Sequence, residues 1–345
     1  MATQGLPSAS VSVLMPCWNA SQTVDEAVES ILSQSRSDFE LIAVDDGSSD
    51  DTRARLEGWA GKDRRVSVLG GDHAGLVEAL NRGLAACRAP YIARMDADDR
   101  IHPDRLAAQR DFLQQETEIA VAGCLVEGFP QGNVREGFRI YIEWLNSLQT
   151  AEAIAREIYI ESPLAHPSVM IRRTWLERVG GYQDHGWPED YDLWLRLHLA
   201  GARFAKVPRV LLQWREHPDR ATRTDSRYSV ENFLRAKAHY LVRGPLADRE
   251  AVFVWGAGQM GRRLSKHLVR NGATLAAFID IDPGKIGRTR RGAPVIAPSS
   301  LMDAWRKAER PVLLSAVGSR GARDLIRSQL TEMGLVEAQD WWAAA

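Results

Sequence analysis

The stretch Tyr91-Ile-Ala-Arg-Met-Asp96-Ala-Asp98-Asp99-Arg-Ile-His-Pro103 joins an apolar run to a cluster of acidic residues. Its first five residues have the pattern of a buried strand, and three carboxylates follow within four positions. Carboxylates at the end of a buried strand repel one another and lose hydration, so a bound cation stabilises them. Mg²⁺ and Mn²⁺ take oxygen ligands of this kind. The alternative interpretation is an acidic turn that caps the helix expected after Pro103.

The segments around this stretch predict strands that alternate with helices. Such alternation is typical of a parallel, doubly wound α/β sheet. In these sheets ligands bind beyond the carboxyl ends of the strands. The expected strands are Val11–Met15, Leu41–Val44, Val66–Leu69 and Tyr91–Met95, and the expected helices are Ser21–Leu32, Gly75–Ala86 and one that follows Pro103.

Polar residues follow three of these strands at the point where each one ends. They form the stretches Pro16–Asn19, Asp45–Ser48 and Asp96–Asp99. Because the carboxyl ends of parallel strands share one edge of a sheet, we expect the three stretches to converge there. An isolated Asp-Asp-Gly is usually only a turn, but two acidic strand ends in one sheet favour a functional site.

A further acidic pair, Glu189 and Asp190, opens a predicted helix whose Leu193, Trp194 and Leu197 are expected to face the core. The helix macrodipole favours carboxylates at a helix start, which gives the pair a purely structural interpretation. Alternatively, Asp190 projects into the cleft and acts as a general base.

A second α/β unit is predicted after the linker Gly244-Pro245, so the expected domains are residues 1–245 and 249–345. It contains a G-x-G-x-x-G turn, Gly256–Gly261, between a strand and a helix, and Asp280 ends the next strand. This arrangement is typical of a dinucleotide site. The unit is short and shows no second half, so the alternative is a degenerate Rossmann-like fold that serves contacts or acceptor binding.

The composition fits a protein of two domains with a substantial core, because the chain has 345 residues and 45% hydrophobic content. Acidic residues outnumber basic ones up to residue 202, and the reverse holds afterwards. This asymmetry suits a cation site in the front part and a phosphate contact in the back part, although ordinary surface charge explains it equally well.

Targeting signals are not evident. The three cysteines form no CxxC pair, which argues against disulfides and zinc and favours a reducing compartment. The segment Met1–Ser10 has neither the basic start nor the apolar centre of a signal peptide. No apolar run approaches the ~20 residues of a spanning helix. We therefore expect a cytoplasmic protein that touches a membrane at most peripherally.

Four ordered segments carry a family resemblance: Val11–Ala20, Val44–Thr52, Met95–Asp99 and Glu189-Asp190. They resemble the motifs of family 2 glycosyltransferases, and the similarity extends over roughly residues 11–223. The resemblance implies a GT-A fold, that of nucleotide-diphospho-sugar transferases. It also implies a hexosyltransferase that works by inverting, metal-dependent transfer from a nucleotide sugar.

The resemblance also assigns roles to individual residues. Asp45 would accept a hydrogen bond from the uracil N3–H, Pro16, Trp18 and Asn19 would line the base, Asp96 would meet the ribose, Asp98 would ligate Mg²⁺ or Mn²⁺, and Asp190 would deprotonate the acceptor hydroxyl. Three further residues are candidates on their chemistry alone: Arg215 for phosphate oxygens, His217 for the metal or the diphosphate, and His166 for the acceptor. A surface or helix-capping role is the alternative for His217.

Three hypotheses about activity follow. The first is transfer from a UDP-sugar to a saccharide or lipid-linked saccharide. The second makes the acceptor queuosine in tRNA, because Trp255–Leu264 and Ala277–Ile286 resemble the tail of eukaryotic β-1,3-N-acetylglucosaminyltransferase-like proteins, which are linked to galactosylation of that nucleoside. The basic back part favours this acceptor, whereas residues 161–169 and 187–196 diverge from those proteins. The third is a nucleotide-binding module regulated by NAD through Gly256–Gly261.

Overall fold

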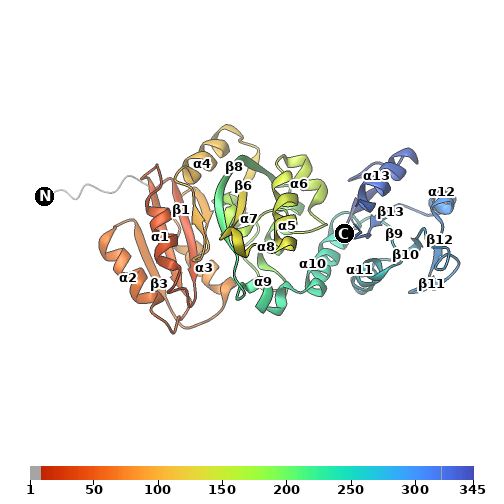
Figure 1. The fold of residues 1–345 in the computed structure, drawn as a ribbon. Helices are drawn as coiled ribbons and strands as arrows, with labels where there is room; N and C mark the ends of the chain where they lie inside the picture. Colours follow the sequence, from red (N-terminus) through yellow and green to blue (C-terminus); the bar gives the residue numbers. More distant parts are fainter. Residues whose placement is uncertain (1–8, 320) are drawn as a thin grey trace. The chain divides into compact units, whose positions relative to one another are not determined.

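The computed structural model describes residues 9–319 and 321–345, which form two compact units (Figure 1). Most of the N-terminal segment considered above, residues 1–8, lies outside this range. Three stretches that precede the expected boundary at 245–249 cluster with the C-terminal residues, the last of them beginning at Ala221. The first unit extends to Ile154 and adds Pro163–His185 and Ala200–Arg220, and the second consists of Ala155–Ser162, Gly186–Leu199 and Ala221–Ala345.

The first unit is built on an eight-stranded sheet with the order β3-β2-β1-β4-β7-β6-β8-β5. The first four strands are parallel, as expected. The remainder, which lies beyond the strands covered by that expectation, is mixed, because β7 is antiparallel to both of its neighbours and β5 is antiparallel to β8. The strands are β1 (Val11–Cys17), β2 (Phe39–Asp45), β3 (Val66–Gly70), β4 (Tyr91–Arg94), β5 (Arg100–Ile101), β6 (Ile119–Phe129), β7 (Met170–Arg172) and β8 (Arg203–Arg215).

Helices cover both faces of this sheet because alternate side chains of the buried strands point to opposite sides. Val13 and Met15 of β1 belong to the core that includes the apolar side of α1 (Val24–Leu32). Leu14 faces α3 (Leu76–Ala86) on the other side, where a Cβ at Gly83 would lie 2.2 Å from the Leu14 side chain. The glycine therefore allows α3 to approach the strand closely.

The remaining helices of this part of the chain lie between the strands in sequence. They are α2 (Thr52–Lys62), α4 (Arg105–Gln115), α5 (Glu136–Ser147), α6 (Ala151–Glu157) and α7 (Arg173–Arg178), with the short 3-10 helices η1 (Gln131–Asn133) and η2 (His166–Ser168).

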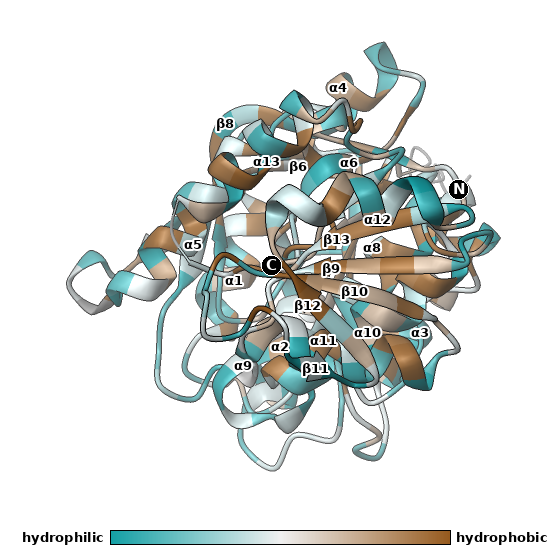
Figure 2. Cartoon of the chain, turned by 90° about the vertical axis from the view of Figure 1, so that its right-hand side faces the viewer, coloured by the Kyte–Doolittle hydropathy of each residue, from teal (hydrophilic) through white to brown (hydrophobic). Residues whose placement is uncertain are grey.

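The second unit contains a six-stranded sheet with the order β11-β12-β10-β9-β13-β14. All neighbours are parallel except β11 and β12. The central strands carry mainly buried apolar residues, which are brown in Figure 2. The strands are β9 (Ala251–Trp255), β10 (Leu275–Ile279), β11 (Thr289–Arg290), β12 (Ala293–Ile296), β13 (Pro311–Ser315) and β14 (Trp341–Ala343).

The glycine turn after β9 is required by the fold itself. Gly256 has φ +111°, and a Cβ at Gly261 would lie 1.8 Å from the Gly256 carbonyl oxygen. Only glycine tolerates these positions. The helices of this unit are α8 (Glu189–Leu199), α9 (Ala221–Thr224), α10 (Val230–Arg243), α11 (Gln259–Arg270), α12 (Leu301–Lys307) and α13 (Ala322–Glu332), with the 3-10 helices η3 (Ser226–Tyr228) and η4 (Pro298–Ser300).

Candidate active site

The loops that follow β1 and β2 are bound to each other at the carboxyl edge of the sheet. The backbone N–H of Asn19 donates to Ser48 Oγ at 2.9 Å, and the N–H of Ser49 donates to Asn19 Oδ1 at 2.9 Å. Asn19 adopts φ +50°, which turns the chain back toward the second loop. The Asn19 side chain therefore holds the two loops together, and its contact with a nucleotide base remains a prediction.

Asp50 reinforces the same junction. Its carboxylate accepts hydrogen bonds from the N–H of Ser21 at 3.1 Å and of Thr52 at 3.0 Å. Partial burial opposes ionisation, but the hydrogen bonds from Thr52 and Ser21 outweigh it and bring the pKa of Asp50 down to about 2. This ionised side chain anchors the start of α2 to the β1 loop.

An exposed aromatic pair lies beside this junction. Trp18 is 56% exposed, and its ring stacks on His73 with centroids 4.7 Å apart. His73 is held by the buried carboxylate of Asp46, whose Oδ2 lies 2.9 Å from His73 Nδ1. The same carboxylate accepts from the N–H of Ala74 at 3.0 Å and of Gly75 at 2.9 Å. The pair offers a flat surface on which a nucleotide base can stack.

Three predicted carboxylates meet around the end of β1. Asp45, the last residue of β2, is buried and pairs in register with Cys17. Burial raises the pKa of the Cys17 thiol, and the negative charges of Asp45, Asp96 and Asp98 raise it further. All three carboxylates therefore lie near one thiol, as the convergence of the strand ends predicts.

The acidic cluster itself consists of Asp96, Asp98 and Asp99, each of which offers an oxygen within 4.8 Å of the others. Asp96 forms an ion pair with Arg94, which is buried in β4. Asp98 Oδ2 lies 2.9 Å from His217 Nε2, so the structure brings together the two residues predicted as metal ligands.

Asp99 is the most deeply buried of the three carboxylates. It is 1% exposed, and its Oδ1 accepts a hydrogen bond from the N–H of Arg215 at 2.7 Å. Burial, followed by the charges of Asp98 and Asp96, raises its pKa well above the ordinary value. Within the described part of the chain, its buried Oδ2 has no hydrogen-bond partner. A divalent cation would relieve this repulsion, so the donor set fits Mg²⁺ or Mn²⁺.

Arg215 fixes the acidic loop from the end of β8. Its Nε donates to the carbonyl of Asp98, and its Nη2 donates to Glu26 of α1, which also pairs with Arg100. The guanidinium lies 4.4 Å from the centroid of the Phe129 ring. A contact of the Arg215 guanidinium with phosphate oxygens remains a prediction.

Sequence reasoning did not identify Glu26, Arg94 or His73 as parts of this site. Arg94 was detectable, because a charged residue inside a buried apolar strand needs a partner. Glu26 and His73 carry no local signal, since their partners lie far away in the sequence.

Asp190 lies in the second unit, at the start of α8. Its Oδ1 accepts a hydrogen bond from the N–H of Tyr191 at 2.7 Å. Its neighbour Glu189 is buried and accepts from the hydroxyl of Tyr228 at 2.8 Å. The structure therefore groups the other predicted donor residues in the first unit, and the role of Asp190 as a base remains a prediction.

The two remaining candidate residues, His166 and Asp280, form contacts within their own units. His166 is buried, with Nε2 3.1 Å from the hydroxyl of Tyr182. Asp280 accepts from the N–H of Ala257 at 2.9 Å and lies 3.2 Å from Lys285 Nζ. Binding a dinucleotide ribose would require Asp280 to give up these contacts.

Within the described residues, no helix has the length and apolarity to cross a membrane.

Sequence comparisons relate the chain to known proteins. Residues 12–180 match the model of Glycosyl transferase family 2. The chain is 33% identical over 244 residues to the putative glycosyltransferase EpsE of Bacillus subtilis, covering 69% of this chain and 84% of that protein. It is 29% identical over 248 residues to the amylovoran biosynthesis glycosyltransferase AmsE of Erwinia amylovora, covering 71% and 89%.

The fold is also shared with a solved structure. The crystal structure of residues 1–349 of S. aureus TarS in complex with UDP-GlcNAc matches with a TM-score of 0.57 and 16% sequence identity. The match covers 76% of this chain and 72% of that chain. At this identity the similarity establishes the fold and not the substrate.

Proposed function

The chain belongs to glycosyl transferase family 2, and from this membership we propose that it transfers a sugar from a UDP-sugar to a hydroxyl of a saccharide or lipid-linked saccharide. The observation that carries the proposal is the cluster of Asp96, Asp98 and Asp99, together with the exposed pair of His73 and Trp18. The charges of Asp96 and Asp98 act on Cys17, the residue before Trp18. An acidic metal site together with a stacking surface suits a nucleoside diphosphate.

The donor would be held by residues of the first unit. Asp45 accepts from the base, Trp18 stacks on it, and Asp96 meets the ribose. Asp98, with His217 beside it, holds Mg²⁺ or Mn²⁺. When bound, this cation neutralises the charge that develops on the diphosphate leaving group. UDP is the first nucleotide to test because TarS, which shares the fold, was solved with UDP-GlcNAc.

The transfer itself needs a base on the acceptor side. A single displacement inverts the anomeric carbon, and Asp190 would take the proton of the attacking hydroxyl. Such a base typically contributes ~10²–10⁴-fold to the rate. The name of AmsE refers to amylovoran, so a growing polysaccharide or its lipid-linked precursor is the acceptor class that we propose.

A panel experiment tests the donor. The full chain is incubated with UDP- and GDP-sugars plus Mn²⁺, and hydrolysis and the melting temperature are followed. A UDP-sugar should be hydrolysed and should raise the melting temperature. Selection of a GDP-sugar would refute the UDP assignment and leave the family activity intact.

Asp190→Asn tests the base. We expect unchanged binding of UDP with Mn²⁺ and a turnover lowered by at least ~100-fold, because an amide cannot accept the proton. Turnover at the wild-type rate would show that another group is the base.

A tRNA acceptor is the competing outcome. It would appear as binding of tRNA at low salt that weakens steeply as salt rises, since phosphate contacts dominate such affinity. If no tRNA binds at low salt, the queuosine hypothesis is removed and the saccharide class remains.

A further inference from the structure

The helix that carries Asp190 is held in place by two tyrosine hydroxyls of the second unit. Tyr228 donates to Glu189 Oε2 at 2.8 Å, and Tyr240 donates to Asp192 Oδ1 at 2.6 Å. These two carboxylates flank Asp190 in the first turn of α8. Tyr240 belongs to α10, which packs against α8, and Tyr228 closes the 3-10 helix η3 just before it.

The Asp192 side chain is fixed in a single arrangement. It is fully buried, and besides Tyr240 it accepts from Trp187 Nε1 at 2.8 Å and from Arg196 Nε at 2.7 Å. A buried carboxylate with three donors cannot move without losing hydrogen bonds in a water-poor environment. The first turn of α8 is therefore rigidly oriented with respect to α10.

α10 is in turn fastened to α11, the helix that follows the glycine turn. Glu231 of α10 lies 2.8 Å from both Lys266 Nζ and His267 Nε2 and 3.3 Å from Arg263 Nε. The hydrogen bonds from Lys266 and His267 lower the pKa of Glu231 to about 2. This charge cluster links α10 to the Rossmann-like layer.

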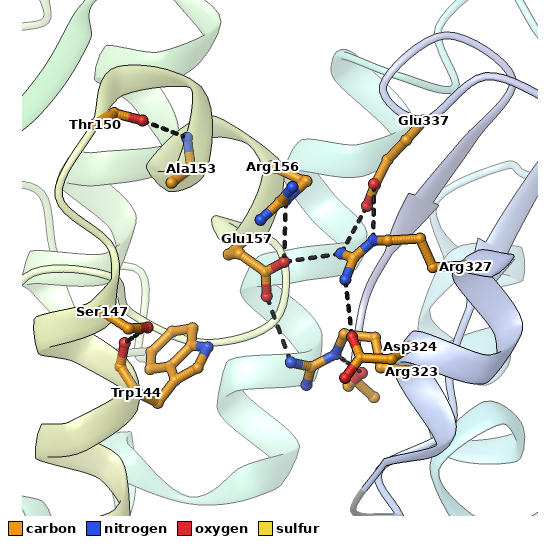
Figure 3. A network of polar contacts seen from close by, with 11 residues as sticks. Trp144, Ser147, Thr150, Ala153, Arg156, Glu157, Arg323, Asp324, Arg327 and Glu337 are labelled. Atoms are coloured by element: carbon orange, nitrogen blue, oxygen red, sulfur yellow. Dashed lines mark hydrogen bonds and ion pairs between the residues drawn. The ribbon is translucent and has the colours of Figure 1, made fainter. Parts of the chain in front are cut away.

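A second connection reaches α8 from α13, through residues 155–162. The buried carboxylate of Glu157 pairs with Arg327 at 2.9 Å and Arg323 at 3.4 Å, and Arg327 also binds Glu337 (Figure 3). The carbonyl of Ile158, the next residue, accepts from the hydroxyl of Tyr191 in α8 at 2.8 Å. Two separate sets of contacts thus converge on the first turn of α8.

We propose that the second unit is the scaffold that positions the base, with Tyr228 and Tyr240 as positioning residues for Asp190. The inference rests on the proposed function, in which Asp190 deprotonates the acceptor. A displacement of about 1 Å in a reacting group can cost ~10²-fold in rate. Loss of either hydroxyl should therefore lower turnover without affecting the donor site, whose proposed residues lie in the first unit.

The test uses Tyr228→Phe and Tyr240→Phe in the full chain, with Tyr159→Phe as the matched control. Tyr159 is also buried in the second unit, but its hydroxyl has no hydrogen-bond partner within the described residues. Circular dichroism during heating gives the fraction of fully folded chains, and turnover is expressed per folded chain, while calorimetry with UDP and Mn²⁺ checks the donor site. We expect at least ~10-fold lower turnover per folded chain in the two test variants, an unchanged donor KM, and wild-type behaviour of the control.

The alternative outcomes are distinct. A purely structural role would lower the fraction of chains that are fully folded in proportion to the activity, leaving turnover per folded chain unchanged, and this would overturn the inference. Unchanged turnover in either correctly folded test variant would overturn the role of that tyrosine. Asp190→Asn in the same assay separates the proposed base from the proposed scaffold. If Asp190→Asn is fully active, Asp190 is not the base. If it is inactive while both tyrosine variants have normal turnover, only the scaffold role is refuted.

Discussion

At the residue scale, Asp98 differs from its acidic neighbours because its carboxylate faces His217 at 2.9 Å. In Asp98→Asn, the amide cannot supply the same charge to a divalent cation, so the gain in UDP affinity that Mn²⁺ provides should fall at least ~10-fold. Calorimetry with and without Mn²⁺ measures this gain. Asp303→Asn, on an exposed part of α12, is the control and should behave as wild type. An undiminished effect of Mn²⁺ in Asp98→Asn would exclude Asp98 as a ligand.

Lys206 gives a prediction about pH. It is buried in β8 with Nζ bonded to the carbonyl of Leu145, and burial lowers its pKa to about 7. Between about pH 7 and the ordinary pKa of 10.5, the unfolded chain binds the Lys206 proton more readily than the folded chain does. The contribution of Lys206 to the free energy of unfolding therefore rises with pH in that window and is smallest below it. Lys206→Met removes this dependence, which amounts to at most about 1.4 kcal/mol per pH unit.

Urea unfolding at several pH values checks this. The free energy of unfolding of the wild type, minus that of Lys206→Met, should increase from pH 7 to pH 9. The exposed Lys62→Met serves as the control and should run parallel to the wild type. If the free energy of unfolding of Lys206→Met changed with pH in parallel with that of the wild type, Lys206 would not titrate in this range.

Sequence information identified the carboxylates that lie near a strand end, and their roles in the site remain predictions. The proximity of Asp45, Asp96 and Asp98 was predictable because each lies at or just after the end of a buried strand, and parallel pairing brings these ends together. Glu26 was not predictable, since its partners Arg100 and Arg215 lie 74 and 189 residues away. Ion pairs of this separation are determined by the tertiary fold.

At the element scale, the loop between β3 and α3 depends on one carboxylate. Asp46→Ala removes the acceptor for the N–H groups of Ala74 and Gly75 and the partner of His73. Each lost hydrogen bond to a charged group costs about 1.5–3 kcal/mol, so the melting temperature should fall. UDP affinity should also weaken because His73 no longer supports Trp18, while the effect of Mn²⁺ should persist. Loss of the Mn²⁺ effect itself would place Asp46 in the metal site.

The strands illustrate what local patterns can and cannot show. The apolar run of β6 from Ile119 to Val126 carries the signal of a buried strand, and it could have been predicted. Strand β5 has only two residues and exists because it pairs with β8, which no local pattern reveals. Strand direction is equally hidden, because parallel and antiparallel strands share the same two-residue side-chain period. The mixed half of the sheet therefore could not be foreseen.

At the scale of the whole molecule, the order of segments in the chain differs from their order in space. The linker at Gly244-Pro245 marks a change in sequence character, and it predicts a boundary there. Residues 155–162 and 186–199 nevertheless cluster with the C-terminal residues. Composition describes each segment by itself and cannot predict which segments contact each other. The contact between Glu157 and Arg323, for example, joins positions 166 residues apart. The second unit thus draws on three separate stretches of sequence.

This interleaving predicts that a chain ending at Asp248 cannot complete the second unit. Glu157 would lose Arg323 and Arg327, and Lys237, also buried, would lose the carbonyl of Ala344. Removing one partner from a buried ion pair costs about 3–5 kcal/mol, because the other charge stays unpaired. The truncated chain should therefore aggregate or melt well below the full chain, which circular dichroism and size-exclusion chromatography measure. Adding residues 249–345 as a separate chain should restore turnover if they supply only the scaffold. A truncated chain that stayed free of aggregates, with the melting temperature and turnover of the full protein, would show that the C-terminal residues are dispensable for orienting α8.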